Sequence, residues 1–231
     1  MTTQTWSWFL LGVEGNKIFR KDDAMTKIMT PSKTTTAGQI DKAVANYRAL
    51  LEKHAGDFNA EAVQIILGQS ELAGEQLVVF RRRVEAVSNL IIRRVTVNQI
   101  RSQQEAVEAT GRSRYTTQEV VDNMPRGEGD EVELVFFKPD LSERDGSISD
   151  DDLELEFELR DLKPADPISV AAFNEADPAF ADEKSHATHW KDADGNWCYA
   201  AFHRWLGERG VDVDRHDSSW LGDWWFVGVR K

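Results

Sequence analysis

The sequence has one cysteine, few basic residues and no apolar run long enough to cross a membrane. Cys198 is the only cysteine among 231 residues, which excludes an internal disulfide and any multi-cysteine metal site. No apolar stretch reaches the roughly 18 residues of a membrane span. The apolar run 6–13 has neither a basic segment before it nor a small-residue cleavage site after it, so we do not expect a signal peptide.

The shortage of basic residues limits the partners that the chain can bind. There are 28 Lys and Arg against 40 Asp and Glu, giving a formal net charge of -12. Such a chain repels nucleic acid and anionic membrane surfaces, so no nucleic-acid partner is expected. We interpret the basic run 81–83 as a solvated face with internal salt bridges rather than a nucleic-acid patch, with docking to an acidic partner as a further alternative. We interpret the excess of carboxylates over 122–161 as a helix surface rather than a nucleic-acid mimic.

The sequence divides into three parts. Residues 1–35 are expected to be poorly structured, because the threonines after Lys33 suggest a linker. Residues 36–128 are expected to be helical, with a strand near 90–97. Residues 129–231 are expected to form an α+β domain, and 41% hydrophobic residues suffice for a globular core.

Helices are predicted from apolar spacing and capping residues. Apolar residues recur at steps of three and four over 36–54: Ile40, Val44, Tyr47 and Leu51. Asn59 begins a second helix that extends toward Phe80, with Gly68 and Gly74 as weak points. Further helices are predicted at 102–109, 116–124, after Ser149, and at 168–176.

Strands are predicted where apolar and polar residues alternate, and they dominate the last third. The runs 90–97 and 131–138 are strands by composition and alternation. The last third has candidate strands at 197–205, 211–214 and 224–230. The third is nearly all apolar and therefore central, so the chain ends inside the sheet of an antiparallel meander. His186 and His189 lie in a stretch expected to be a polar loop.

Five of the eight tryptophans lie in the C-terminal run 197–231. The large apolar residues there alternate with small or polar ones. Alternation places Asp212 and Asp214 on the face opposite Val211 and Val213, so substitution of the aspartates leaves the core unchanged. This is the pattern of a rigid scaffold that carries exchangeable side chains.

The run AAFHRWLGERGVDVDRHDSSWLGDWWFVGVRK resembles the variable region of diversity-generating retroelement variable proteins, which have a C-type-lectin fold. In that family a reverse transcriptase replaces template adenines at random, often in AAC asparagine codons. A family-like parent is NRWNxERxVNVNRNDxxWNDNWWFAGVR. Its fixed framework is matched here by Phe202, Arg204, Trp205, Glu208, Arg209, Val211, Val213, Arg215, Asp217, Trp220, Trp224, Trp225, Phe226, Gly228, Val229 and Arg230.

The remaining positions are those at which the resemblance implies exchange. They are His203, Leu206, Gly210, Asp212, Asp214, His216, Ser218, Ser219, Leu221, Gly222 and Asp223. Adenine replacement in AAC yields His, Leu, Gly, Asp and Ser but never Trp or Glu, and both of the latter occupy framework positions. The tryptophans Trp205, Trp220, Trp224 and Trp225 are expected to be the buried scaffold.

The resemblance implies a non-enzymatic ligand-binding protein with a C-type-lectin-like domain over 129–231: a strand, two helices and an antiparallel meander. The expected ligand is a protein or a surface glycan, with no cofactor and no metal. The N-terminal helices would attach the domain to a larger assembly, such as a virion or a cell-surface complex.

An enzyme is the alternative. Formylglycine-generating enzymes share the fold but need reactive cysteines, and we expect Cys198 to be a buried structural thiol. His203, His216 and Asp212 form a candidate metal or acid–base set. The motif 192–196 resembles part of a calcium loop, and we interpret it as a turn before a strand.

Overall fold

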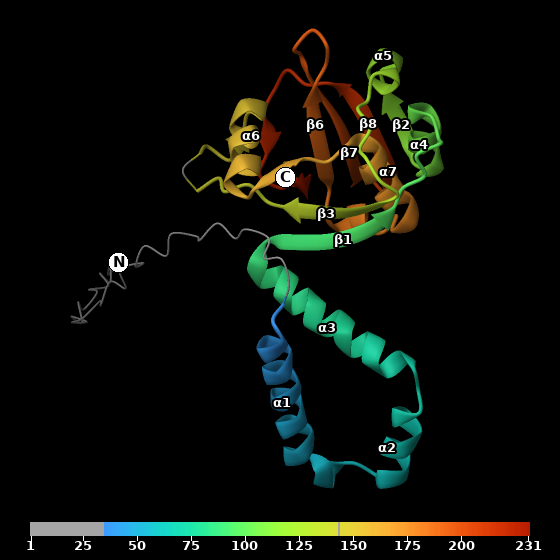
Figure 1. Cartoon of the computed structure of the whole chain (residues 1–231), viewed down its shortest axis with the longest axis vertical. Helices are drawn as coiled ribbons and strands as arrows, with labels where there is room; N and C mark the ends of the chain where they lie inside the picture. Colours follow the sequence, from blue (N-terminus) through green and yellow to red (C-terminus); the bar gives the residue numbers. More distant parts are fainter. Residues whose placement is uncertain (1–34, 143) are drawn as a thin grey trace, which may run out of the picture.

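A helical arm leads into a sheet domain (Figure 1). The structure is a computed structural model that describes residues 35–142 and 144–231, so nearly all of the expected segment 1–35 lies outside it. The arm consists of α1 (Ala37–Lys53), α2 (Ala60–Leu67) and α3 (Glu71–Ser88). The expected α+β class, with a helical N-terminal part and a C-terminal sheet, is confirmed. Among the described residues no helix is both long and apolar enough to cross a membrane.

The arm begins and turns where capping residues predict. Thr36 and Gln39 form a reciprocal capping box at the start of α1. Asn59 caps α2 by accepting a hydrogen bond from the Ala62 amide at 3.0 Å. The second predicted helix is interrupted at Gly68, which ends α2, so α3 is a separate helix.

The sheet domain contains, in chain order, β1 (Leu90–Thr96), α4 (Gln103–Ala109), β2 (Ser113–Thr116), α5 (Gln118–Asp122), β3 (Glu131–Phe137), β4 (Ser147–Ile148), α6 (Asp150–Leu159), β5 (Leu162–Pro164), α7 (Pro167–Ala176), α8 (Phe180–Glu183), β6 (His186–Lys191), β7 (Trp197–Trp205), β8 (Glu208–Arg215), β9 (Trp220–Leu221) and β10 (Trp225–Arg230). The predicted strands at 90–97, 131–138, 197–205, 211–214 and 224–230 are present as β1, β3, β7, β8 and β10.

The large sheet joins strands from both halves of the sequence. Its order is β1-β3-β10-β6-β7-β8-β2, and β5 pairs with β10. β1 and β2, both from the segment expected to precede the domain, form the two ends of this order. The packing division therefore falls near Asn89, which has a left-handed φ of 50°, and not near residue 129.

The strand β10 is central as predicted, but the meander is shorter than predicted. β6, β7 and β8 are neighbours paired antiparallel. β10 does not continue this series, because it lies between β3 and β6 and pairs parallel with β6. The chain thus crosses back over the sheet after β8, and the crossing segment 216–224 lies at the surface beside the helix α6 (Figure 1).

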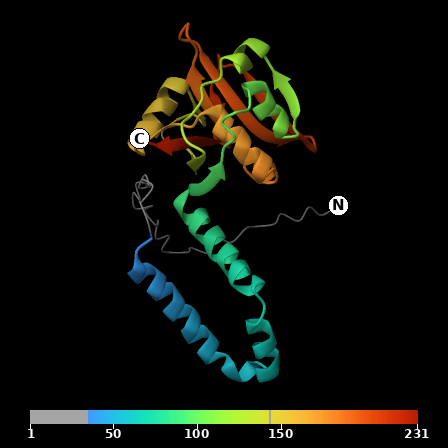
Figure 2. The same cartoon turned by 45° about the vertical axis from the view of Figure 1, so that its right-hand side comes forward.

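Each face of the sheet has its own apolar core. On one face, α4, α5, α7 and α8 cover a core that includes Phe136, Phe202 and Val213. On the other face, α6 and the small sheet of β4 and β9 cover a second core that includes Phe157 and Phe226. Figure 2 shows the two groups of helices on either side of the strands. The tight packing on both faces is what holds β7 and β8 in fixed register.

The expectation that His186 and His189 lie in a polar loop is wrong. Both side chains are buried in strand β6. The His186 ring lies between the Asn174 amide, 2.9 Å from Nε2, and the Lys184 carbonyl, 2.8 Å from Nδ1. Burial lowers the pKa of His186 to about 3. Polar residues can occupy a central strand here because each has a buried partner far away in the sequence.

This burial makes the stability of the protein sensitive to acid. The folded protein keeps His186 neutral, whereas the unfolded chain protonates it below its usual pKa of 6.5. The free energy of unfolding should therefore fall as pH drops from 6.5 toward about 3, by at most about 1.4 kcal/mol per pH unit from this residue. Urea denaturation at several pH values measures the slope. The slope of the unfolding free energy against pH should be smaller for His186→Gln than for the wild type. His54→Gln, on the exposed arm, should have the wild-type slope. Equal slopes for all three would contradict the assignment.

Candidate ligand-binding face

The β7–β8 hairpin positions the first group of expected exchangeable residues. His203 pairs with Gly210, Ala201 with Asp212, and Tyr199 with Asp214. Because directly paired residues point to the same side of a sheet, these three pairs share one face. Val211 and Val213, one residue out of step, are fully buried on the other face, as predicted.

A second group follows in the crossing segment. Ser218, Ser219, Leu221, Gly222 and Asp223 are all exposed there. The short strand β9 holds this segment against β4, since Ile148 pairs with Trp220 and Ser147 with Leu221. We call the surface made by both groups, together with Trp220 and Trp224, the C-terminal face.

Aromatic rings connect the two groups into one surface. The ring of His216 lies 4.4 Å from that of Trp220, which meets Trp224 edge-on at 5.6 Å. Trp224 in turn meets His203 at 6.2 Å. These contacts connect His203 in the hairpin with His216 in the crossing segment through the rings of Trp220 and Trp224. Rigid aromatic surfaces lose little conformational entropy when a ligand binds.

Three positions on this face depend on one another. The Nε2 atom of His203 lies 3.2 Å from a carboxylate oxygen of Asp212. The same ring covers Gly210 so closely that an added Cβ atom would come within 2.5 Å of it. A side chain at position 210 therefore requires a different conformation, or a different residue, at position 203.

His216 is anchored in the interior, unlike its neighbours. Its Nδ1 atom forms a short hydrogen bond with Asp150, the buried first residue of α6. Asp150 also accepts a hydrogen bond from Trp220 Nε1 at 2.9 Å and is bonded to His189 Nδ1 at 2.7 Å. The other ring nitrogen of His189 lies 2.9 Å from Glu154. This buried polar cluster was not predicted, because its members are far apart in the sequence.

The charges of the cluster are mutually stabilised. Burial raises the pKa of Asp150, but the hydrogen bonds from His189, His216 and Trp220 outweigh burial and hold this pKa well below its usual range. Burial lowers the pKa of His189, but its bonds to Asp150 and Glu154 prevail and raise it. Burial and the nearby aspartates raise the pKa of Tyr199 to about 12, so this phenol on the same face stays neutral.

Framework arginines fix the ends of the hairpin. Arg209 forms a bidentate ion pair with Asp182, with its closest oxygen at 2.6 Å. Arg215 donates to Glu119 at 2.8 Å. The Nε of Arg204 donates to the Gly207 carbonyl at 3.3 Å. These charge-assisted hydrogen bonds fix the arginine side chains against neighbouring segments.

The burial expected for the tryptophans is found for Trp220 but not for Trp205. Trp220 is 4% exposed, and Trp224 and Trp225 are partly buried. Trp205 is 71% exposed because it ends β7 beside the hairpin turn, beyond the helices that cover the sheet. Leu206, in that turn, is 94% exposed and stands at the tip of the hairpin.

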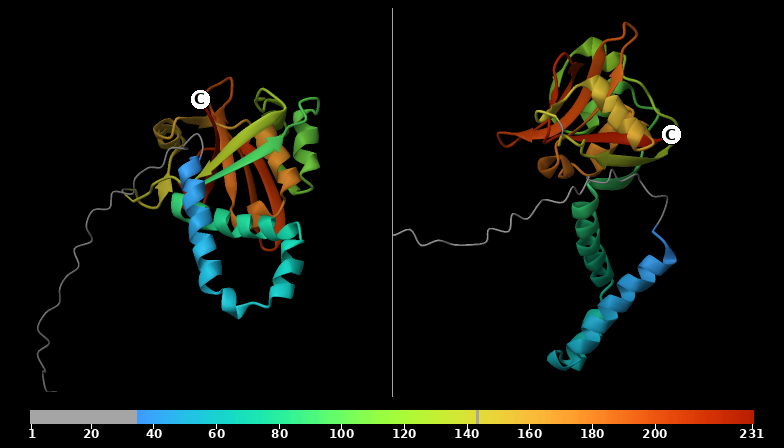
Figure 3. Two further views of the ribbon diagram at one scale, coloured as in Figure 1. Left: turned by 60° about the horizontal axis from the view of Figure 1, so that its bottom comes forward. Right: turned by 90° about the vertical axis from the view of Figure 1, so that its left-hand side faces the viewer.

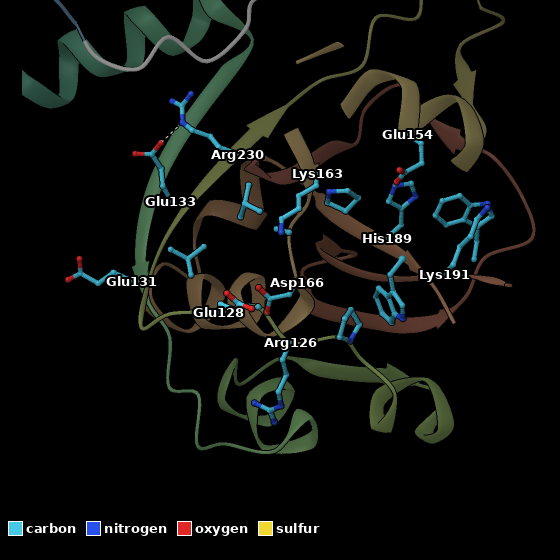
Figure 4. Close-up of a pocket in the computed structure, with 18 of the residues that line it drawn as sticks. Arg126, Glu128, Glu131, Glu133, Glu154, Lys163, Asp166, His189, Lys191 and Arg230 are labelled. Atoms are coloured by element: carbon cyan, nitrogen blue, oxygen red, sulfur yellow. Dashed lines mark hydrogen bonds and ion pairs between the residues drawn. The ribbon is translucent and has the colours of Figure 1, made fainter. Parts of the chain in front are cut away.

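A separate cleft of about 1050 Å³ opens beside α6 and β6. Figure 4 shows Glu154 pointing toward His189 in its wall, and Arg230 bonded to Glu133 farther along. The buried chain from His216 through Asp150 and His189 to Glu154 thus runs from the C-terminal face to this cleft. Nothing in the sequence pattern indicated the cleft.

The features that suggested enzymes have structural explanations. Cys198 is buried, and burial raises the pKa of its thiol. Asp192 accepts hydrogen bonds from the Asp194 and Asn196 amides, so the motif 192–196 is the turn between β6 and β7, as predicted. His203 and His216 contact different carboxylates. Within the described part of the chain, no group of three or more His, Cys, Asp or Glu side chains is placed to hold a metal ion.

Comparison with known proteins identifies no relative. No protein-family model, curated protein or solved structure matches the chain.

Substitutions at position 216 should separate the anchored residue from its exposed neighbours. His216→Leu leaves one oxygen of buried Asp150 without its donor, which should cost about 1–3 kcal/mol of the free energy of unfolding. His216→Asn keeps an amide donor and should cost less. Ser218→Ala, which removes only a hydroxyl bonded to the outer nitrogen of His216, is the control. Urea denaturation measures all three, and a His216→Leu protein as stable as the control would refute the anchoring role.

Proposed function

We propose that the chain is a ligand-binding protein of the diversity-generating retroelement class, with a C-type-lectin-like sheet domain that displays exchangeable side chains on its C-terminal face. The observation that carries this proposal is the gathering of those side chains. Asp214, Ser218, Leu221 and Asp223 are exposed, and ring contacts bring their segments together around Trp220. A patch built in this way suits a protein or a surface glycan as ligand.

The fixed residues of the same segment support the proposal by their different environment. Phe202, Val211, Val213 and Phe226 are buried in the two cores. Arg209 and Arg215 are held in ion pairs. Exchange at the exposed positions leaves these contacts intact, so the fold tolerates many surfaces.

The backbone at Leu206 gives further support. Leu206 and Gly207 form the two-residue hairpin turn with φ values of 48° and 90°, as in a type I′ turn. Such turns favour Asn followed by Gly, and leucine is poorly suited to the left-handed conformation. An asparagine is what the family-like parent has at this position, and adenine replacement converts its codon to one for leucine.

The enzyme alternative is favoured by one observation only. His203 and Asp212 form a partly exposed pair at 3.2 Å, an arrangement that general acid–base catalysis also uses. Two features favour the binding function. The residue opposite His203 is Gly210, and in the described structure the His203 ring has no polar partner other than Asp212.

Exchanging the exposed positions as a block tests the proposal. We expect a protein with new residues at Asp214, Ser218, Ser219, Leu221 and Asp223 to keep its fold, with each change within about 0.5 kcal/mol, because these side chains bury little. Its choice of partner should change in a binding screen against panels of proteins and glycans. Unchanged partner choice by the block variant would count against the proposal, and loss of a measured turnover would favour the enzyme.

Trp220→Ala is the contrasting variant. It removes a buried indole and the hydrogen bond to Asp150, so it should cost about 3–5 kcal/mol of stability. Trp205→Ala, beside the exposed turn of the β7–β8 hairpin, should cost far less, which thermal unfolding will show. A comparable loss from both changes would mean that the tryptophans act as one scaffold after all.

The coding DNA offers an independent test. A near-copy of the segment encoding 203–223 should lie close by, differing only where that copy carries adenine, beside a reverse transcriptase gene. Differences at other bases would exclude the proposed origin of the diversity.

A further inference from the structure

The helical arm exposes more apolar surface than is usual for a monomeric protein. Its helices have no buried residue, although sixteen large apolar side chains lie in 37–88 with more than a third of their surface exposed. Figure 3 shows that the arm projects away from the sheet domain, which meets it near the end of α3, where Glu85 pairs with Arg93. At roughly 100 Å² per fully exposed side chain, the arm presents on the order of 900 Å² of apolar surface. Typical monomers expose apolar patches of about 300–600 Å².

The spacing of these side chains is that of a coiled-coil seam. On α1 they recur at steps of four, three and four residues: Ile40, Val44, Tyr47 and Leu51. On α3 they recur at steps of three, four and three: Leu77, Phe80, Val84 and Val87. A seven-residue repeat of this kind selects another helix with the same repeat, because side chains of one helix fill the gaps of the other.

The two seams lie on antiparallel helices of one hairpin. Gln76, next to the α3 seam, donates a hydrogen bond to the hydroxyl of Tyr47 in the α1 seam at 2.6 Å. The helices diverge from there and leave both seams open (Figure 1). Two such hairpins brought together complete a four-helix bundle, in which each seam faces apolar partners.

We propose that the arm binds the arm of a second copy of this chain, forming a homodimer through the seams of α1 and α3. Three observations favour a second copy over a different protein. The matching seven-residue repeats are on this chain itself. The eight seam side chains expose on the order of 400 Å² of apolar surface, close to the apolar share of a standard interface of roughly 800 Å² per partner. The segment 37–88 has seven acidic and six basic residues, so two arms do not repel each other even though the whole chain carries -12.

The dimer would give the protein two C-terminal faces, and bivalent attachment strengthens weak binding to a surface that carries many ligands. The dimer does not depend on the proposed ligand-binding function, because no residue of the C-terminal face takes part in it. The two ideas can fail separately.

Matched valine variants of the full chain test the dimer. Val84→Glu places a charge in the α3 seam. Val79→Glu places the same charge on the same helix, about 120° around the helix axis from the middle of the seam. Both valines are exposed, so neither change disturbs the sheet domain. Val44→Glu repeats the seam change on α1. Circular dichroism in the far and near ultraviolet checks that helices and tryptophan packing remain.

Sedimentation velocity and light scattering at micromolar concentration give the oligomeric state. We expect the wild type and Val79→Glu to be dimers, and the two seam variants to dissociate with a constant raised by about a hundredfold, because a buried charge without a partner is costly. A monomeric wild type, a trimer or larger species, or equal weakening by Val79→Glu and Val84→Glu would each overturn the proposal. A monomeric chain would return the arm to its expected role in attachment to a larger assembly.

Discussion

The C-terminal face depends on the hydrogen bonds made by the buried carboxylate of Asp150. This carboxylate is placed by Ser149, which caps α6 and fixes the direction of the first turn. Three donors converge on it, from His189 in β6, His216 after β8, and the Trp220 indole. A buried charge is tolerated only when its partners are complete, so these three groups cannot be moved independently. The single carboxylate thereby ties the helix, the central sheet and the crossing segment together.

The orientation of the Trp220 ring follows from the hydrogen bonds of Asp150. With its indole N–H bonded to Asp150, Trp220 presents its ring edge or face to His216, Tyr199 and Trp224. Those contacts set the spacing between the β7–β8 hairpin and the crossing segment. Residues that project from the crossing segment, such as Ser219, Leu221 and Asp223, can then differ in size and charge, because they are exposed. Depth from the surface does not coincide with the expected fixed and exchangeable positions, since Trp205 is exposed and Gly210 is buried.

Much of the fold could be predicted from local patterns, because those patterns act locally. The alternation of Val211 and Val213 with aspartates identified β8 and its buried face, and Ser149 identified the start of α6. The strand β6 was missed because its polar residues are buried by distant partners: His186 by Asn174, and His189 by Asp150. No local pattern records such a pairing. The parallel pairing of β2 with β8 is non-local for the same reason.

The candidate site was predictable to the same extent. Alternation and the resemblance placed Asp212 and Asp214 on an exposed strand face, where they lie. The resemblance treated Trp205 and Trp220 alike, yet Trp205 beside the hairpin turn is exposed, whereas Trp220 in the crossing segment packs in the second core and bonds to Asp150. Equally, the sequence could not show that His216 is bonded within the interior while Ser218 beside it is exposed.

Contacts among the proposed exchangeable positions limit which combinations of residues the C-terminal face can carry. His203 covers Gly210 and bonds to Asp212, so the three residues act as a unit. Position 216 is restricted differently. A residue there that cannot donate a hydrogen bond leaves an oxygen of buried Asp150 without its donor, which costs stability. If the eleven positions are exchanged as proposed, they offer fewer workable surfaces than eleven independent choices would. The freest positions are Ser219, Leu221 and Asp223 in the crossing segment and Leu206 at the hairpin tip, which are exposed, whereas a side chain at Gly222 would meet Leu141. Diversity that changes partner choice without loss of stability should concentrate there, and the inner positions should change in concert.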